Sequence, residues 1–144
     1  MEMLVVMAII GLIVAVSTPS VGAGIDSVRM ASAVDSISSF LNSAVNYAER
    51  RQQPVELVFS QREARISAYS GDGGFTRELE LPDGILLEAV LPQIPEETER
   101  RIVLMPGASV PGIGIQIGNR RGAHRIVRLD PMTGFPRVES VDTK

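Results

Sequence analysis

The chain has 144 residues, of which 44% are apolar and 22% charged, and its formal net charge is −3. This size suits one domain, and the charge balance excludes both a wholly basic nucleic-acid-coating protein and an acidic disordered tail. The sequence has no cysteine and one histidine, which excludes disulfide scaffolds and thiol chemistry and argues against sites built from several histidines.

The first element is a strongly apolar N-terminal segment. Residues 3–16 include no charged or strongly polar side chain, and they account for much of the positive mean hydropathy of +0.16. Fourteen residues are short of the about 20 that a membrane-spanning helix needs. A secretory signal peptide would open with basic residues, whereas this segment opens with Glu2 and the first basic residue is Arg29.

The same helix is predicted to continue to a break at residues 52–54, because Pro54 cannot extend it. Apolar residues recur there at spacings of three and four, which predicts a stripe that faces a core. The stripe consists of Met30, Ala33, Val34, Ile37, Phe40, Leu41, Ala44, Tyr47 and Ala48. Polar residues such as Ser27, Asp35 and Asn46 lie off it.

Glu2 heads the apolar segment, and Pro19 follows it seventeen residues later. The segment 2–19 resembles the N-terminal helix of type IV pilins and type II secretion pseudopilins. The resemblance implies that Glu2 is an assembly residue, which pairs with the N-terminal amine of a neighbouring subunit in a filament. It also implies that Pro19 kinks the helix. A lone acid in an apolar helix is costly in a bilayer, so it requires such a reason.

The resemblance departs from the family at the start of the chain. Met1 falls where the fourth mature residue should be, and the family's leader and its cleavage site are absent. We expect that the true start lies upstream and that the sequence is a truncated gene product or fragment. A prepilin peptidase is the processing partner that the family implies.

Beyond Pro54 the period changes to short runs that are rich in β-branched and aromatic residues. Strands are predicted at 55–59, 64–69, 77–81, 85–90, 101–105, 113–117, 125–129 and 135–138. The acidic stretch 92–100 is predicted to be a solvated loop. The expected fold class is α+β: a hydrophobic membrane or filament helix (1–28), the amphipathic half of the same helix (29–53), and an antiparallel β-rich, pilin-like head (54–144).

Further segments resemble the GspH/FimT family of minor pilins and pseudopilins. They are the helix end and first strand at 44–57, a strand and Pro-Gly turn at 102–109, and a closing hairpin at 125–129 and 134–138. Only the first 20 residues are individually diagnostic of the family.

No catalytic, metal or cofactor site is expected, and the chain is not predicted to be an enzyme. His124 lacks a patterned nucleophile nearby. Glu78 and Glu80 share one face of a strand, which is typical of a solvated sheet surface. Asp72, flanked by glycines, offers too few oxygen ligands for calcium.

Arginines gather near the C-terminus and are candidates for contact with DNA or a partner protein. They are Arg120, Arg121, Arg125, Arg128 and Arg137. The Gly-Arg-x-Arg motif of DNA-binding FimT-type pilins is not reproduced: the corresponding turn, residues 134–137, keeps Arg137 but has Phe135 in place of the other arginine. Aromatic residues for base stacking are also few.

The predicted function is a minor pseudopilin of a type II secretion system. The expected partners are other pseudopilins or pilins, the bacterial inner membrane, and secreted cargo, with the head in the periplasm. The first alternative is a FimT-like minor type IV pilin that binds DNA during natural transformation. The second alternative is a membrane-anchored β-domain with no filament role.

Overall fold

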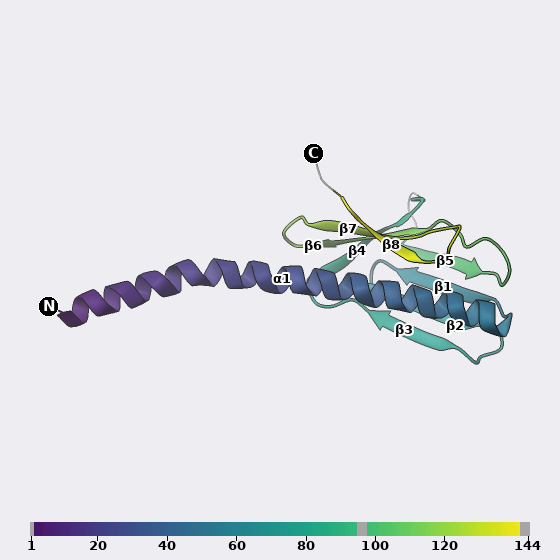
Figure 1. Cartoon of the computed structure of the whole chain (residues 1–144), viewed down its shortest axis with the longest axis horizontal. Helices are drawn as coiled ribbons and strands as arrows, with labels where there is room; N and C mark the ends of the chain where they lie inside the picture. Colours follow the sequence, from purple (N-terminus) through teal and green to yellow (C-terminus); the bar gives the residue numbers. More distant parts are fainter. Residues whose placement is uncertain (1, 95–97, 142–144) are drawn as a thin grey trace.

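The computed structural model describes residues 2–94 and 98–141, and of residues 17–21 it describes the backbone but not the side chains. One long helix, α1 (Glu2–Arg51), precedes eight strands in two antiparallel sheets (Figure 1). The strands are β1 (Val55–Ser60), β2 (Arg65–Ser70), β3 (Thr76–Glu80), β4 (Ile85–Leu91), β5 (Glu99–Leu104), β6 (Gly114–Asn119), β7 (His124–Leu129) and β8 (Pro136–Ser140). The α+β fold with an N-terminal helix packed on antiparallel sheets is confirmed.

The C-terminal end of α1 lies where the sequence predicts it. The helix ends at Arg51, Gln52 adopts a positive φ of 53°, and Pro54 precedes β1. Arg50 and Arg51 occupy the last turn, where positive charge is favourable next to the exposed carbonyl groups.

The second half of α1 supplies one wall of the hydrophobic core. The predicted stripe is confirmed, since eight of its nine members are buried: Met30, Ala33, Val34, Ile37, Phe40, Leu41, Ala44 and Ala48. The ninth, Tyr47, packs partly buried against Phe75, with ring centroids 4.7 Å apart. The helix therefore contacts strands of both sheets through an apolar face of 3.6-residue period.

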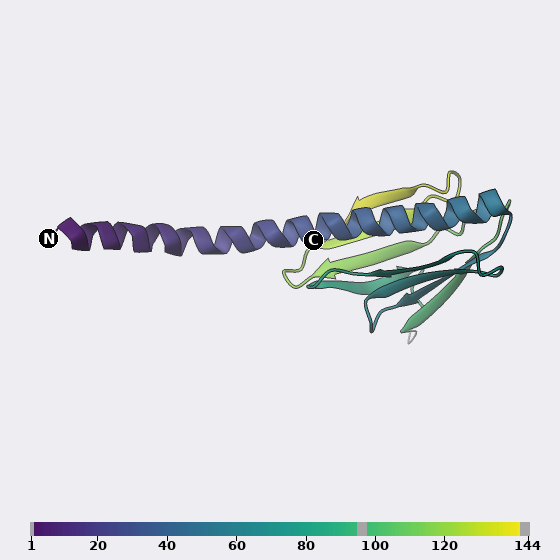
Figure 2. The ribbon, with the colours of Figure 1, turned by 90° about the horizontal axis from the view of Figure 1, so that it is seen from below.

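The two four-stranded sheets provide the rest of the core, and Figure 2 shows the helix lying alongside them. The first has the order β3-β2-β1-β5, and its inward residues include Val55, Leu57 and Phe59. The second has the order β4-β6-β7-β8, with Ile117 and Val127 among its inward residues. All eight predicted strands are present, with bounds that differ from the predicted ones by no more than two residues.

The predicted loop at 92–100 needs a correction at its end. Glu99 and Arg100 belong to β5, where they pair with Ser60 and Phe59 of β1. Ladder hydrogen bonds to the neighbouring strand stabilise the extended conformation there, despite the charged side chains. Glu96 and Glu97 lie outside the described residues.

The first half of α1 projects away from the head (Figures 1 and 2). Within the described part of the chain, no helical stretch has both the length and the apolar character needed to cross a bilayer. The prediction that residues 1–28 form a membrane-spanning half is therefore not supported. The strongly apolar run ends at Val16, which leaves it shorter than the about 20 residues of a span, because residues 17–25 are uncharged but rich in serine, threonine, proline and glycine.

The backbone of α1 remains helical through Pro19. The side chain of Pro19 lies outside the described residues. A proline in a helix interior removes one backbone hydrogen bond, which allows bending without ending the helix. The kink at Pro19 stays a prediction.

The turn that joins β2 to β3 is organised by the carboxylate of Asp72. This carboxylate accepts hydrogen bonds from the Ser70 hydroxyl, the Gly74 amide at 2.9 Å and the Tyr47 hydroxyl at 3.2 Å. The hydrogen bond from Ser70, followed by that from Gly74, holds the pKa of Asp72 below its ordinary value of 3.8. The turn is thereby tied to α1 through Tyr47.

A pH-dependent contribution to stability follows from this lowered pKa. The contribution of Asp72 is present above its ordinary pKa and is lost as the pH falls through the lowered, folded-state value. The melting temperature of Asp72→Ala should therefore lie below that of the unchanged chain at about pH 6, and the difference should shrink at about pH 2.5. A difference that grows on acidification would contradict this assignment.

Candidate assembly surface and arginine cluster

The most unusual surface is the apolar stalk, which we define as residues 3–16 of α1. Its large side chains are exposed by between 51% (Val6 and Ile10) and 81% (Met3). The residues are Met3, Leu4, Val5, Val6, Met7, Ile9, Ile10, Leu12, Ile13, Val14 and Val16. Because consecutive positions are apolar through more than a full turn of 3.6 residues, the stalk is apolar on every side.

An apolar surface of this kind needs an apolar partner. Soluble monomers rarely expose contiguous apolar patches larger than a few hundred Å². Each side chain that is removed from water contributes roughly 1.5–3 kcal/mol. Packing against other helices or lipid is therefore strongly favoured for the stalk.

Glu2 lies exposed in the first turn of α1, next to the stalk. A carboxylate is favourable there because the unpaired amide groups of a helix N-terminus carry partial positive charge. This position also makes the carboxylate available to a neighbouring chain. The assembly role of Glu2 stays a prediction.

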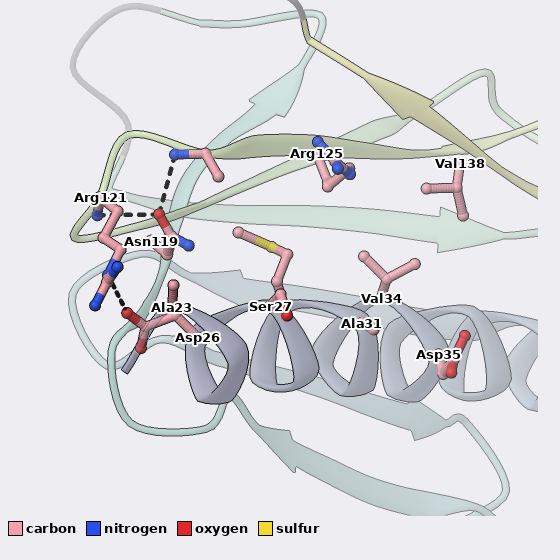
Figure 3. A pocket seen from close by; sticks show the side chains of 12 residues that line it. Ala23, Asp26, Ser27, Ala31, Val34, Asp35, Asn119, Arg121, Arg125 and Val138 are labelled. Carbon is pink, nitrogen blue, oxygen red and sulfur yellow. Dashed lines mark hydrogen bonds and ion pairs between the residues drawn. The ribbon is translucent and has the colours of Figure 1, made fainter. Parts of the chain in front are cut away.

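A cavity of about 440 Å³ lies between α1 and the second sheet, near the point where the helix leaves the head (Figure 3). Met30, Ala31 and Val34 contribute apolar side chains from α1, and Arg121 and Arg125 face it from the β6–β7 region. The cavity thus brings two of the predicted arginines next to the helix.

Arg121 joins the head to α1. Its Nε lies 2.6 Å from the carboxylate of Asp26 (Figure 3). Asn119 orders the turn that carries Arg121, because its Oδ1 accepts hydrogen bonds from the amides of Arg121 and Ala123, each at 3.0 Å. Gly22 leaves room on the helix, since a Cβ there would lie 2.9 Å from the Arg121 guanidinium.

Arg121 and Arg125 line this cavity, whereas Arg120, Arg128 and Arg137 are not among the residues that line it. Arg128 lies 3.4 Å from Glu139, and Arg137 lies 2.8 Å from Asp130. Arg125 and Arg128 are three residues apart on β7 and so point to opposite faces of the sheet. Arg125 donates to the carbonyl oxygen of His124 at 2.9 Å, and Arg120 is exposed in the turn. Three of the five therefore already have a carboxylate partner within the chain.

His124 has a partner that the sequence does not indicate. Its Nδ1 lies 2.8 Å from Glu88, whose carboxylate also accepts a hydrogen bond from Gln116 at 2.9 Å. Glu88 lies at a β-bulge between β4 and β6, and a Cβ on Gly118 would collide with its carboxylate. Glu88 and His124 come from β4 and β7, which both pair with β6, so the alternation of a single strand could not reveal this pair.

The carboxylate pair of β3 has a cationic neighbour, Arg65. Arg65 lies 2.9 Å from Glu80 and 4.0 Å from Glu78, on the outer face of the first sheet. This arrangement agrees with the solvated sheet surface that the sequence predicts. Within residues 2–94 and 98–141, no group of three or more metal-ligating side chains is found.

Comparisons with protein-family models, with curated proteins and with solved structures gave no match for this chain. The resemblance to pilins and pseudopilins consequently rests on the residues of the chain itself.

Proposed function

We propose that this chain is a minor pseudopilin, similar to GspH, that assembles through its N-terminal helix in a type II secretion system. The observation that carries the proposal is the stalk, which is apolar on every side and projects away from the head (Figure 1). A β-rich head on a projecting apolar helix is the shape that such assembly requires.

Assembly would exchange lipid or water for protein contacts along the stalk. Side chains such as Leu12 and Val16 would pack against the helices of neighbouring subunits, while the heads face outward. Glu2 would offset the charge of an adjacent N-terminal amine, which removes the cost of an unpaired carboxylate in apolar surroundings. The subunit would then support protein export through contacts of its head with other subunits or cargo.

The proposal places the chain at the bacterial inner membrane, with the head in the periplasm. Residues 3–16 are shorter than a complete span, so this placement rests on their exposed apolar side chains and on the family resemblance. The partners implied are other pseudopilins, the membrane and a secreted protein.

Substitution of Glu2 tests the assembly role. Glu2→Leu and Glu2→Gln should each reduce the yield of assemblies that sediment from membranes, because both remove the charge that pairs with the amine. The melting temperature of the head should stay unchanged, since Glu2 lies outside it. Unchanged assembly in both variants would favour a plain anchored domain.

Deletion of the gene separates the two filament functions. Loss of protein export with intact DNA uptake would support the pseudopilin. The reverse result would support the FimT-like pilin, for which Arg120 and Arg125 are the cluster members without a carboxylate partner among the described residues.

A further inference from the structure

A groove rich in arginine lies at the end of α1 that is farther from the stalk. Arg50 and Arg51 of the last helical turn and Arg77 of β3 line it, together with Asn46, Ser43 and other polar residues. Its volume is about 530 Å³. We call these three arginines and their surroundings the basic groove.

The charges of the basic groove are not balanced by the described part of the chain. Among the described residues, no carboxylate lies within ion-pair distance of Arg50, Arg51 or Arg77. The Arg77 guanidinium lies 5.6 Å above the centre of the Phe75 ring, and one of its nitrogens lies 3.5 Å from the Ser43 hydroxyl. Arg77 is thus held in place while its charge remains available to an anion.

The outer face of the first sheet carries the opposite charge. Its strands present four glutamates and two arginines, and we call this set the acidic face. Its members are Glu56, Glu78, Glu80, Glu99, Arg65 and Arg101. Each of the four glutamate side chains is at least 40% exposed. Carboxylates outnumber guanidinium groups there by two to one.

The two surfaces cannot meet within one chain. Residues 77 and 78 are adjacent on β3, so their side chains point to opposite faces of the sheet. Arg77 points toward α1, where it reaches Ser43, whereas Glu78 points outward to Arg65. In two copies, however, the basic groove of one can face the acidic face of the next. Such a head-to-tail contact joins two different surfaces, so it can link successive subunits in an open filament.

We propose that the basic groove docks the acidic face of a second copy of this chain, which fixes the rotation of neighbouring heads once their stalks have packed. This inference rests on the proposed function, because the stalks bring the heads together. Lipid headgroups around the stalk are a poorer fit, since about 30 helical residues separate it from the groove, or about 45 Å along the axis.

Disulfide cross-linking between two full-length variants tests the contact, since the natural sequence has no cysteine. One variant carries Asn46→Cys in the basic groove, and the other carries Thr76→Cys on β3 at the margin of the acidic face. Mixed in lipid vesicles and oxidised, they should form a heterodimer. Pairing Asn46→Cys with Met132→Cys, on the turn of the second sheet and 92% exposed, should yield little product.

Charge reversal supplies the second arm of the test. Arg50→Glu with Arg51→Glu should lower the heterodimer yield about tenfold, because like charges would then face each other. Glu78→Arg with Glu80→Arg in the opposite copy should restore it. Arg29→Glu with Arg120→Glu, two exposed arginines outside the groove, is the charge-matched control and should leave the yield unchanged.

The outcomes separate this inference from the proposed function. A photo-crosslinking amino acid in place of Leu12 reports packing of the stalks in the same vesicles. The docking inference alone would be overturned if cross-links formed at Leu12 but the heterodimer between Asn46→Cys and Thr76→Cys did not. It would also be overturned if charge reversal left the heterodimer yield unchanged. Absence of cross-links at Leu12 would contradict the proposed filament. A heterodimer yield that falls with the arginine reversal and recovers with the glutamate reversal would support both the filament and the docking contact.

Discussion

Leu41→Ala is expected to lower the free energy of unfolding by about 2–5 kcal/mol. Leu41 is fully buried where α1 meets the sheets, so truncation removes apolar contacts and leaves a cavity that the rigid surroundings fill incompletely. The measurement is urea denaturation of the full-length chain in detergent micelles, followed by the circular dichroism of the strands.

Leu86→Ala is the matched control for Leu41→Ala. It makes the same chemical change on β4, but Leu86 is 55% exposed, so the cost should stay below about 1 kcal/mol. Equal losses in the two variants would show that the second half of α1 is not the wall of the core.

Met7→Asp combined with Leu12→Asp is expected to abolish assembly while the head remains folded. The two residues are 71% and 70% exposed and lie on different sides of the stalk. A neighbouring helix that packs against either side would therefore contact one of the two introduced carboxylates. A carboxylate in an apolar helix centre costs about 2.5–3.5 kcal/mol, which corresponds to at least about a hundredfold loss of association. Sedimentation of assemblies from membranes measures the loss.

The apolar exchange Met7→Leu with Leu12→Met is the control for this double variant. It keeps the volume and the apolar character of the stalk, so assembly should persist. If both double variants assembled equally well, the stalk would not be the assembly surface.

The sequence was sufficient to predict the elements whose periodicity is set by burial. The stripe from Met30 to Ala48 follows the 3.6-residue period because one helix face meets the core. Strands such as β1, in which Val55, Leu57 and Phe59 are buried and alternate with partly exposed residues, follow the period of two. Both periods are local properties and can be read without knowledge of the partner elements.

The pairing of charged side chains could not be predicted in the same way. Arg121 pairs with Asp26 across more than ninety residues of sequence, and His124 meets Glu88 because β4 and β7 both pair with β6. The arginines near the C-terminus looked like one basic patch because they are close in sequence. Instead, the alternation of β7 places Arg125 and Arg128 on opposite faces, and three of the five arginines pair with acids from different parts of the chain: Asp26, Asp130 and Glu139.

The basic groove was missed for a related reason. Arg50 and Arg51 are typical of a helix C-terminus, where they stabilise the last turn, and Arg77 stands alone in an acidic stretch. Only the packing of β3 beside α1 brings the three together. Charge that gathers through tertiary contacts leaves no local signal in the sequence.

Photo-crosslinking at Leu12 of the full-length chain in membranes shows whether the stalk is an assembly surface. We expect cross-links to other copies or related subunits, and we expect Met7→Asp in the same chain to remove them. Cross-links to lipid alone, with the chain remaining monomeric at every protein-to-lipid ratio, would contradict this assembly role.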